Sequence, residues 1–407
     1  MIAVSEADPP LSTRPKIACT IQQLSARLAA AQRSIRPLDA VAWGEDVERR
    51  FLSHAGRELP AVDRDYYLSR PLPFQPDRKL NELADLERDV ERTLGSRDGA
   101  GRILKRMCRE YAGLVHMLAY RGTATFAMIS AKLFGTARSA ADGLRALDAM
   151  SRRFPAALCD AGPACGAGQA MLELSLRLGP NFPDWHGLRI KLVDDLIADA
   201  AAGSSYLKLR RSSTFTSADL RQLEVHEGWI HLGTSYNARH QPVCSFLRKG
   251  PPSSTRTQEG LAVFAEFLAG VAVPERVRRL KQRVAGIHMA EEGADFCQVY
   301  RFFRETEADE REAYQQTARV FRGSRPAGCG PFTKDLCYVS GLGDVLAWLT
   351  DGGPDAAALV PLLFCGKVAV EDIPTLAELH CRGWLESPLY VPAPFRDGNA
   401  LAGRLTR

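Results

Sequence analysis

The residues best suited to chemistry in this 407-residue chain lie in the segment VHEGWIHL (225–232). His226 is followed directly by Glu227 and, five positions after His226, by His231. Imidazole nitrogens are common zinc ligands, and a glutamate beside such a ligand is placed to act as a general base. Three fixed residues within six positions also arise by chance, so the segment predicts either a zinc site or two ordinary histidines near a glutamate.

The five-residue spacing of the two histidines conflicts with a regular α-helix. At about 100° per residue, side chains four positions apart differ by about 40°, whereas those five apart differ by about 140°. A π-type turn inserts one residue and returns positions i and i+5 to one face. Gly228 weakens the α-helix inside this spacing. We therefore predict a helix that starts at the capping pair Thr216 and Asp219 and is widened between 226 and 231.

A catalytic zinc site needs a third protein ligand and an open position for water. The next candidate segment is TQEGLAVFAEFLAG (257–270), whose apolar residues follow helical spacing. Glu259 lies near the expected start of this helix and is our predicted third ligand. Glu266 lies two turns later on roughly the same face. It is expected either to support a ligand or to replace Glu259 as the ligand.

Composition and charge narrow the class of protein. Hydrophobic residues make up 45% of the chain and charged residues 25%, which is typical of a globular protein. The net charge is +5 without a block of five like charges, so we expect no nucleic-acid partner. The basic clusters RVRRLKQR (276–283) and KLRR (208–211) are predicted to be solvated faces. No apolar run reaches the roughly 18 residues of a membrane span.

The cysteines and the N-terminus indicate the compartment. Ten cysteines are scattered along the chain without any C-x-x-C pair. The first residues lack the charged and apolar regions of a signal peptide. Together these features predict a reduced, cytoplasmic protein with no membrane partner. The oligomeric state is not specified by any of them.

Hydrophobic periodicity predicts a mostly helical α+β protein in three parts. Residues 1–16 read as a loose tail, 17–160 as a helical region, and 161–407 as the catalytic region with a C-terminal helical part. The boundary is expected in the loop CDAGPACGAG (159–168). The clearest predicted elements are an amphipathic helix from Leu80 to a stop at Gly95, helices over 101–119 and 137–150, and strands at LRIKLV (188–193) and YLKLR (206–210).

Several segments together resemble one known family. They are RGTATF (121–126), SAKLFG (130–135), NARHQP (237–242), TQEGLAVF (257–264), ARVFRG (318–323), FTKDLCYVSG (332–341) and GWLESPLYVP (383–392). In this order they resemble the flavohaemoglobin-expression-modulating QEGLA-motif proteins. Vertebrate relatives of that family are the microtubule-associated tyrosine carboxypeptidases, which remove the C-terminal Tyr of α-tubulin.

The resemblance implies a zincin-like metallopeptidase core. By position, His226, His231 and Glu259 become the ligands of Zn²⁺, and Glu227 becomes the catalytic base. The implied function is a zinc-dependent peptidase of carboxypeptidase type that removes a C-terminal residue from a peptide or protein. The family's usual stretch reads like H-E-I-G-T-H followed by Leu-Arg, whereas this chain has HEGWIHLGT. Because of this departure, a catalytically silent binding or regulatory protein with the same fold is the alternative.

Further residues are candidates for the reaction and for substrate binding. Tyr338 is the candidate donor to the developing oxyanion, with a core tyrosine as the alternative. A terminal carboxylate suits basic side chains, and we expect Arg322 and Lys334 first, with Arg319 one helical turn from Arg322. Structural ion pairs are the alternative for these three. Asn237 is expected either to line the cleft or to satisfy loop backbone.

Overall fold

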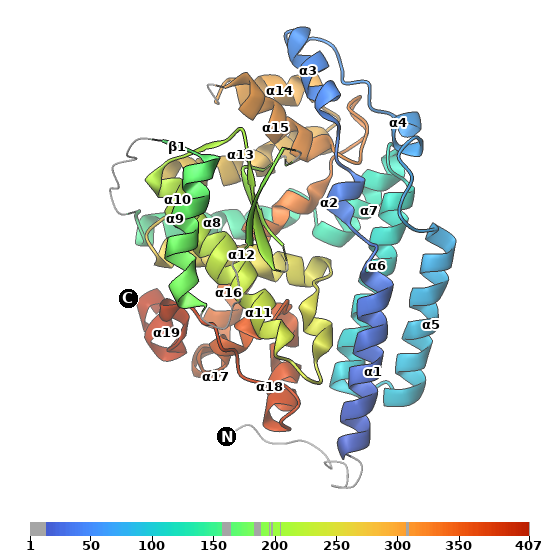
Figure 1. Ribbon diagram of the computed structural model, residues 1–407, viewed down its shortest axis with the longest axis vertical. Coiled ribbons are helices and arrows are strands. Elements are labelled where there is room, and N and C mark those ends of the chain that lie inside the picture. The colour runs from blue at the N-terminus through green and yellow to red at the C-terminus, as the bar shows by residue number, and fades with distance from the viewer. Residues whose placement is uncertain are drawn as a thin grey trace.

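The computed structural model describes residues 14–156, 164–182, 189–194, 196, 198–203, 205–306 and 309–406. Helices take up 68% of the chain and the sheets are small, so the protein is α+β and mostly helical, as predicted. The helices are arranged around α12 (Pro252–Leu268), which lies in the middle of the molecule (Figure 1).

The first third of the chain forms helices only. They are α1 (Arg14–Gln32), α2 (Pro37–Ala40), α3 (Glu45–Ser53), α4 (Arg64–Leu68), α5 (Pro76–Leu94), α6 (Gly99–Ala119), α7 (Ala124–Phe134), the short η1 (Arg138–Ala140) and α8 (Ala141–Arg153). The predicted helix before Gly95 is confirmed as α5, which buries Leu83, Leu86 and Val90. Helices α1, α5 and α6 lie side by side (Figure 1).

The predicted part boundaries compare with the structure as follows. Helix α1 begins at Arg14, so the last three residues of the expected tail are helical, and residues 1–13 lie outside the described residues. The predicted division at 160 falls in 157–163, which is also outside them. The largest buried cluster contains residues from both sides of that division, from Ile21 to Leu401.

The strands form two small sheets beside the central helices. One has the order β2 (Arg189–Val193), β4 (Tyr206–Arg210), β3 (Ala200–Ala202), with β2 parallel and β3 antiparallel to β4. The other pairs β1 (Cys165–Gly166) with β5 (Thr214–Phe215). Both predicted strands are thus confirmed. Strand β3 lies at the edge of its sheet, next to the segment that carries the histidines.

The remaining helices cover the centre and the C-terminal end. They are α9 (Ala167–Leu178), η2 (Gly179–Asn181), α10 (Ser217–Leu223), η3 (Glu224–Leu232), α11 (Gly233–Arg239), η4 (Ser245–Arg248), α13 (Pro274–Glu291), α14 (Phe296–Arg304), α15 (Glu310–Phe321), η5 (Thr333–Leu336), α16 (Cys337–Asp351), α17 (Gly353–Leu359), η6 (Val360–Phe364), η7 (Val370–Asp372), α18 (Ile373–Cys381), η8 (Ala393–Phe395) and α19 (Gly398–Thr406).

Helices α12 and α16 cross at two glycines. A Cβ atom added to Gly260 would lie 1.9 Å from the carbonyl carbon of Gly341, and one added to Gly341 would lie 1.9 Å from the carbonyl oxygen of Arg256. No side chain fits at so short a distance from backbone. The two helices therefore approach backbone to backbone, and this crossing sets where the side chains of α12 point.

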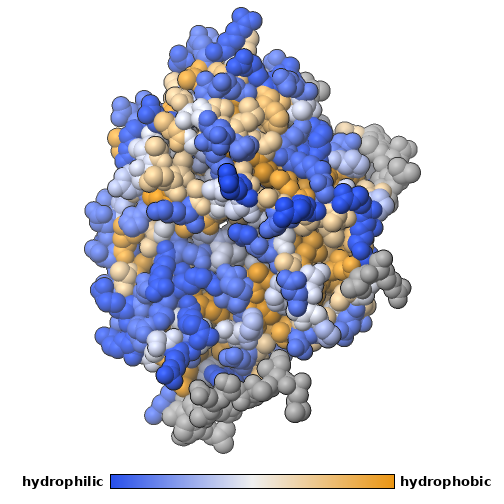
Figure 2. Space-filling view, turned by 180° about the vertical axis from the view of Figure 1, so that it is seen from behind, coloured by the Kyte–Doolittle hydropathy of each residue, from blue (hydrophilic) through white to orange (hydrophobic). Residues whose placement is uncertain are grey.

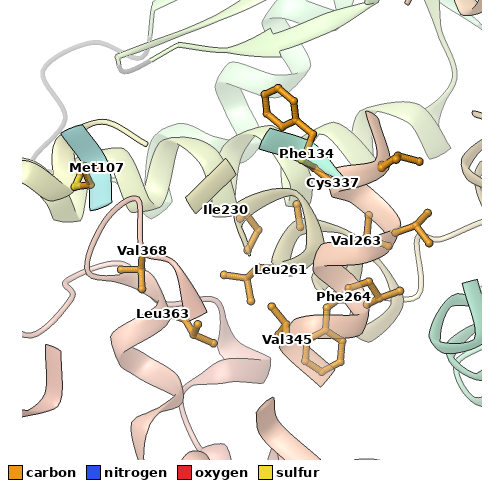
Figure 3. Close-up of a cluster of buried hydrophobic side chains, with 14 of the residues drawn as sticks. Met107, Phe134, Ile230, Leu261, Val263, Phe264, Cys337, Val345, Leu363 and Val368 are labelled. Carbon is orange, nitrogen blue, oxygen red and sulfur yellow. The ribbon is translucent and has the colours of Figure 1, made fainter. Parts of the chain in front are cut away.

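An apolar cluster surrounds this crossing. Ile230 of η3, Leu261 and Phe264 of α12 and Val345 of α16 are all buried in it (Figure 3). Burial of such side chains stabilises the fold by about 1.5–3 kcal/mol each. The cluster thereby holds η3 against α12, and both of these elements carry candidate site residues.

Three features of the described residues concern membrane spans, the surface and the cysteines. No helix in this part of the chain is long and apolar enough to cross a membrane. The face opposite that of Figure 1 shows hydrophilic side chains interspersed with apolar ones (Figure 2). The nine cysteines of the described residues are free thiols.

Candidate metal centre and active site

The two histidines lie on a π-helix. Helices α10, η3 and α11 form one continuous helical run, and Thr216 caps it in a reciprocal capping box with Asp219. The predicted widening is confirmed, although it extends over all nine residues of η3 rather than a single turn. A Cβ atom on Gly228 would lie 2.4 Å from Cδ2 of Leu178, so glycine also allows η3 to pack against α9.

This geometry brings the two imidazoles together with a carboxylate. The ring centroids of His226 and His231 are 4.9 Å apart. Oε2 of Glu259 lies 3.4 Å from Nε2 of His226 and 3.5 Å from Nε2 of His231. One potential ligand atom from each of the three residues lies within 4.8 Å of the others. The three residues predicted as ligands therefore converge.

The two carboxylate oxygens of Glu259 have different surroundings. It lies in the third turn of α12, so the prediction that it is near the helix start was wrong. Its Oε1 accepts a hydrogen bond of 2.7 Å from Nζ of Lys334. Its buried Oε2 has no hydrogen-bond partner among the described residues. Burial opposes ionisation, but Lys334 and the imidazoles outweigh it and hold the pKa of Glu259 well below its usual range.

Glu266 supports His226 from the opposite side of the ring. Its Oε1 lies 2.6 Å from Nδ1 of His226, and Arg276 donates two hydrogen bonds to the carboxylate, at 3.0 and 3.1 Å. Burial is outweighed by Arg276 and His226, which lower the pKa of Glu266 to about 2. Of the two predicted roles for Glu266, the geometry matches support of a ligand.

The electrostatics of the cluster favour positive charge at its centre. Burial alone would lower the pKa of His226, but the carboxylates of Glu259 and Glu266 outweigh burial and raise it to about 10. Of these two carboxylates, Glu259 faces Nε2 of both imidazoles, whereas Glu266 faces Nδ1 of His226. The two carboxylates thus favour a positive charge on the His226 ring.

Glu227 is fixed by the edge strand. Its Oε2 accepts a hydrogen bond of 2.7 Å from the backbone N–H of Ala202, on β3. Glu227 follows His226 directly on the π-helix, its charge contributes to the raised pKa of His226, and the bond to the strand limits its movement.

Tyr338 lies next to the histidines at the start of α16. Its ring centroid is 6.0 Å from that of His226, and the side chain is half-buried. The charged groups of Lys334 and Arg283 each lie 5.4 Å from the ring centroid, and that of Arg276 lies at 5.6 Å. Tyr338 therefore lies beside His226, and three basic side chains surround its aromatic ring.

The predicted substrate-binding cations have different partners. Arg319 makes a buried two-pronged ion pair with Asp335, at 2.6 and 3.1 Å. Lys334 is paired with Glu259, as described above. Arg322 is buried 4.0 Å from Asp335, and its guanidinium lies over the ring of Phe332. The alternative of structural ion pairs thus describes Arg319 best.

Comparison with known proteins identifies the family to which the chain belongs. A family model described as microtubule-associated tyrosine carboxypeptidase matches residues 49–407. The chain belongs to this family. The comparison with curated proteins found no match. Among solved structures, the chain is similar to a protein from Colwellia psychrerythraea described as a lipoprotein, with 13% identity, a TM-score of 0.41, and coverage of 92% of this chain and 75% of that chain.

Each residue of the QEGLA motif (258–262) makes a contact that the structure explains. Gln258 accepts hydrogen bonds from Thr234 and Lys367, at 2.8 and 3.2 Å, and so ties α12 to the end of the π-helix. Glu259 faces the histidines, and Gly260 forms the crossing with α16. The last two residues, Leu261 and Ala262, are fully buried.

The side chain of Asn237, a candidate for substrate binding, is hydrogen-bonded to backbone groups instead. It is buried, and its amide nitrogen donates to the carbonyl groups of Phe364 and Tyr390, both at 2.8 Å. Its amide oxygen accepts from the N–H groups of Leu389 and Tyr390, both at 2.9 Å. The cleft-lining role is therefore corrected to the alternative: Asn237 anchors the C-terminal segment.

Two site residues were missed in the basic cluster RVRRLKQR. Arg276 binds Glu266, and Arg283 faces Tyr338, so the prediction that this cluster is a solvated face was wrong for both. They are seven residues apart and thus share a face of α13. That spacing is the one signal available in the sequence, but three further arginines and lysines between them hide it.

Proposed function

We propose that this protein is a zinc-dependent metallopeptidase that removes the C-terminal residue of a peptide or protein. Membership of the carboxypeptidase family supports carboxypeptidase-like activity. The observation that carries the proposal is the convergence of His226, His231 and Glu259, with Glu227 next to His226 in the sequence.

The residues fit zinc in type and in separation. Two imidazole nitrogens and one carboxylate oxygen form a known catalytic zinc set. Ligand atoms about 2.0–2.1 Å from a tetrahedral zinc ion lie about 3.4 Å from one another. Oε2 of Glu259 lies 3.4 and 3.5 Å from the two Nε2 atoms and lacks a hydrogen-bond donor. Glu266, by accepting from Nδ1 of His226, leaves Nε2 of that ring free to bind the metal.

When bound, zinc polarises the scissile carbonyl and lowers the pKa of the attacking water. Glu227 takes the proton of that water and delivers it to the leaving amine. Its Oε2 keeps the hydrogen bond from Ala202, so Oε1 serves for the transfer. The bond from the edge strand thereby orients the carboxylate before the substrate arrives.

We propose that Tyr338 stabilises negative charge on the reacting carbonyl oxygen. Its ring is next to His226, and its hydroxyl interacts with the guanidinium of Arg319. Because that guanidinium only donates hydrogen bonds, the hydroxyl proton remains available to an oxyanion. We expect loss of one such donor to lower the rate about 100- to 1,000-fold.

Hydrolysis of peptides tests the proposal. Zinc-loaded protein should release single amino acids from the C-terminus of a random hexapeptide library, as measured by mass spectrometry. Glu227→Gln should abolish release while keeping the metal, because its side chain is not a ligand. Absence of any hydrolysis by zinc-loaded wild-type protein would contradict the proposal and favour the alternative of a catalytically silent protein.

A further inference from the structure

The basic residues around Tyr338 outnumber the carboxylates. The basic residues are Arg276, Arg283, Arg319, Arg322 and Lys334, and the carboxylates are Glu259, Glu266 and Asp335. Three close pairs use up the carboxylates: Arg276 with Glu266, Lys334 with Glu259, and Arg319 with Asp335. Arg322 shares Asp335 with Arg319, at 4.0 Å, whereas no ion pair joins Arg283 to a carboxylate of the described residues.

These two arginines differ in accessibility. Arg322 is buried, and its guanidinium lies over the ring of Phe332. Arg283 is half-buried, and its guanidinium lies 5.4 Å from the ring centroid of Tyr338. Its Nε donates a hydrogen bond of 3.1 Å to Oε1 of Gln316, on α15. Among the described residues, no carboxylate forms an ion pair with Arg283.

An enclosed cation without a counter-ion is costly. Burial first, and then the like charge of Arg319, lower the pKa of Arg283 to about 10. The guanidinium is nevertheless held in place by Gln316, through Nε only. Its two terminal nitrogens form the fork that binds a carboxylate through two parallel hydrogen bonds. This arrangement suits an anion that arrives with the substrate.

We propose that Arg283 binds the terminal α-carboxylate of the substrate and makes the enzyme specific for free C-termini. The inference rests on the proposed carboxypeptidase function. The scissile carbonyl and the terminal carboxylate are one residue apart, roughly 3.5 Å along an extended chain. Tyr338 contacts both regions, since its ring lies beside His226 on one hand and Arg283 on the other. The candidate metal centre and Arg283 thus both adjoin the ring of Tyr338, as binding of a C-terminal residue by both would require.

A binding experiment tests the inference without turnover. Zinc-loaded Glu227→Gln protein is titrated with two fluorescein-labelled hexapeptide libraries, identical except for a free or an amidated C-terminus. We expect tighter binding of the free form, and we expect Arg283→Gln in the same background to remove this preference, about 10- to 100-fold. Arg278→Gln, on the same helix but directed to Gln282 and Thr306, is the matched control and should keep the preference.

The outcomes separate this inference from the proposed function. A preference that survives Arg283→Gln, or no preference in the Glu227→Gln protein at all, overturns the inference. If wild-type protein hydrolyses nothing but the preference is lost with Arg283→Gln, the proposed function fails and the carboxylate site stands. Arg283→Lys provides a second variant: it keeps the charge but lacks the fork, so it should recover only part of the preference.

Discussion

Oε1 of Glu266 lies 2.6 Å from Nδ1 of His226, while Nε2 of the same ring faces Glu259. One imidazole is thus held between two carboxylates of α12 that are seven residues apart, on one face of the helix. Because Glu266 also binds Arg276, the orientation of a proposed metal ligand depends on a residue of α13. The predictions below follow from this and related contacts.

Removing the charge of Glu266 should weaken zinc binding. We expect Glu266→Gln to lower the zinc affinity about 10- to 100-fold, because the acceptor at Nδ1 of the imidazole loses its negative charge. Competition with a fluorescent chelator measures this affinity. Glu275→Gln, at the exposed start of the neighbouring helix α13, is the control and should bind zinc as wild type. Equal affinities for both variants would contradict the supporting role of Glu266.

The glycine crossing should tolerate no side chain. In Gly260→Ala, the new Cβ would meet the backbone of Gly341, so the helices must separate. We expect a loss of about 3 kcal/mol or more in the free energy of unfolding, measured by urea denaturation. Gly168→Ala in α9 is the control, since a Cβ there has no neighbour within 4 Å. A Gly260→Ala protein as stable as this control would refute the packing argument.

Acid should destabilise the protein partly through Asp335. Burial opposes its charge, but Arg319, Arg283 and Arg322 outweigh burial and hold the pKa of Asp335 well below its usual range. A carboxyl with a lowered folded-state pKa stabilises the fold above its unfolded value of about 3.9, and this contribution is lost as the pH falls further. In urea unfolding between pH 7 and pH 3, stability should therefore fall less steeply for Asp335→Asn than for wild type.

The same variant has a second consequence at neutral pH. Asp335→Asn leaves buried Arg319 without its counter-ion, which should cost about 3–5 kcal/mol in the free energy of unfolding at pH 7. Wild-type and variant curves that run parallel over the whole pH range would show that Asp335 does not contribute through its ionisation.

Asn237 should matter for stability and not for metal binding. Asn237→Ala removes four hydrogen bonds to the backbone of residues 364, 389 and 390, and each buried group left unpaired costs about 1–3 kcal/mol. Hydrogen exchange should accelerate in residues 386–392, while the zinc content stays that of wild type. Loss of zinc with unchanged exchange would instead place Asn237 in the site.

The sequence was most informative where spacing along one helix decides the geometry. The five-residue separation of His226 and His231 predicted the π-helix, because only widening brings both side chains to one face. The capping pair Thr216 and Asp219 predicted the start of the same helical run for a similar reason. Both features are local, so they follow from backbone geometry without knowledge of the tertiary contacts.

The missed residues depend on packing between distant segments. Arg283 reads as a solvated charge in RVRRLKQR, and only the placement of α13 against η5 and α15 turns it toward Tyr338. Asn237 lies shortly after His231 in the sequence, which suggested a role in the cleft. Its hydrogen-bond partners, however, lie more than 120 residues further along the chain. Neither arrangement leaves a periodic signal in the sequence.

Metal analysis tests the central claim most directly. Purified protein, loaded with zinc and dialysed, should contain one zinc ion per chain by mass spectrometry, because we propose His226, His231 and Glu259 as its three ligands. His231→Ala should lose most of this zinc, and His240→Ala, outside the cluster, should retain it. Zinc-free wild-type protein after loading, or equal zinc in wild type and His231→Ala, would contradict the account.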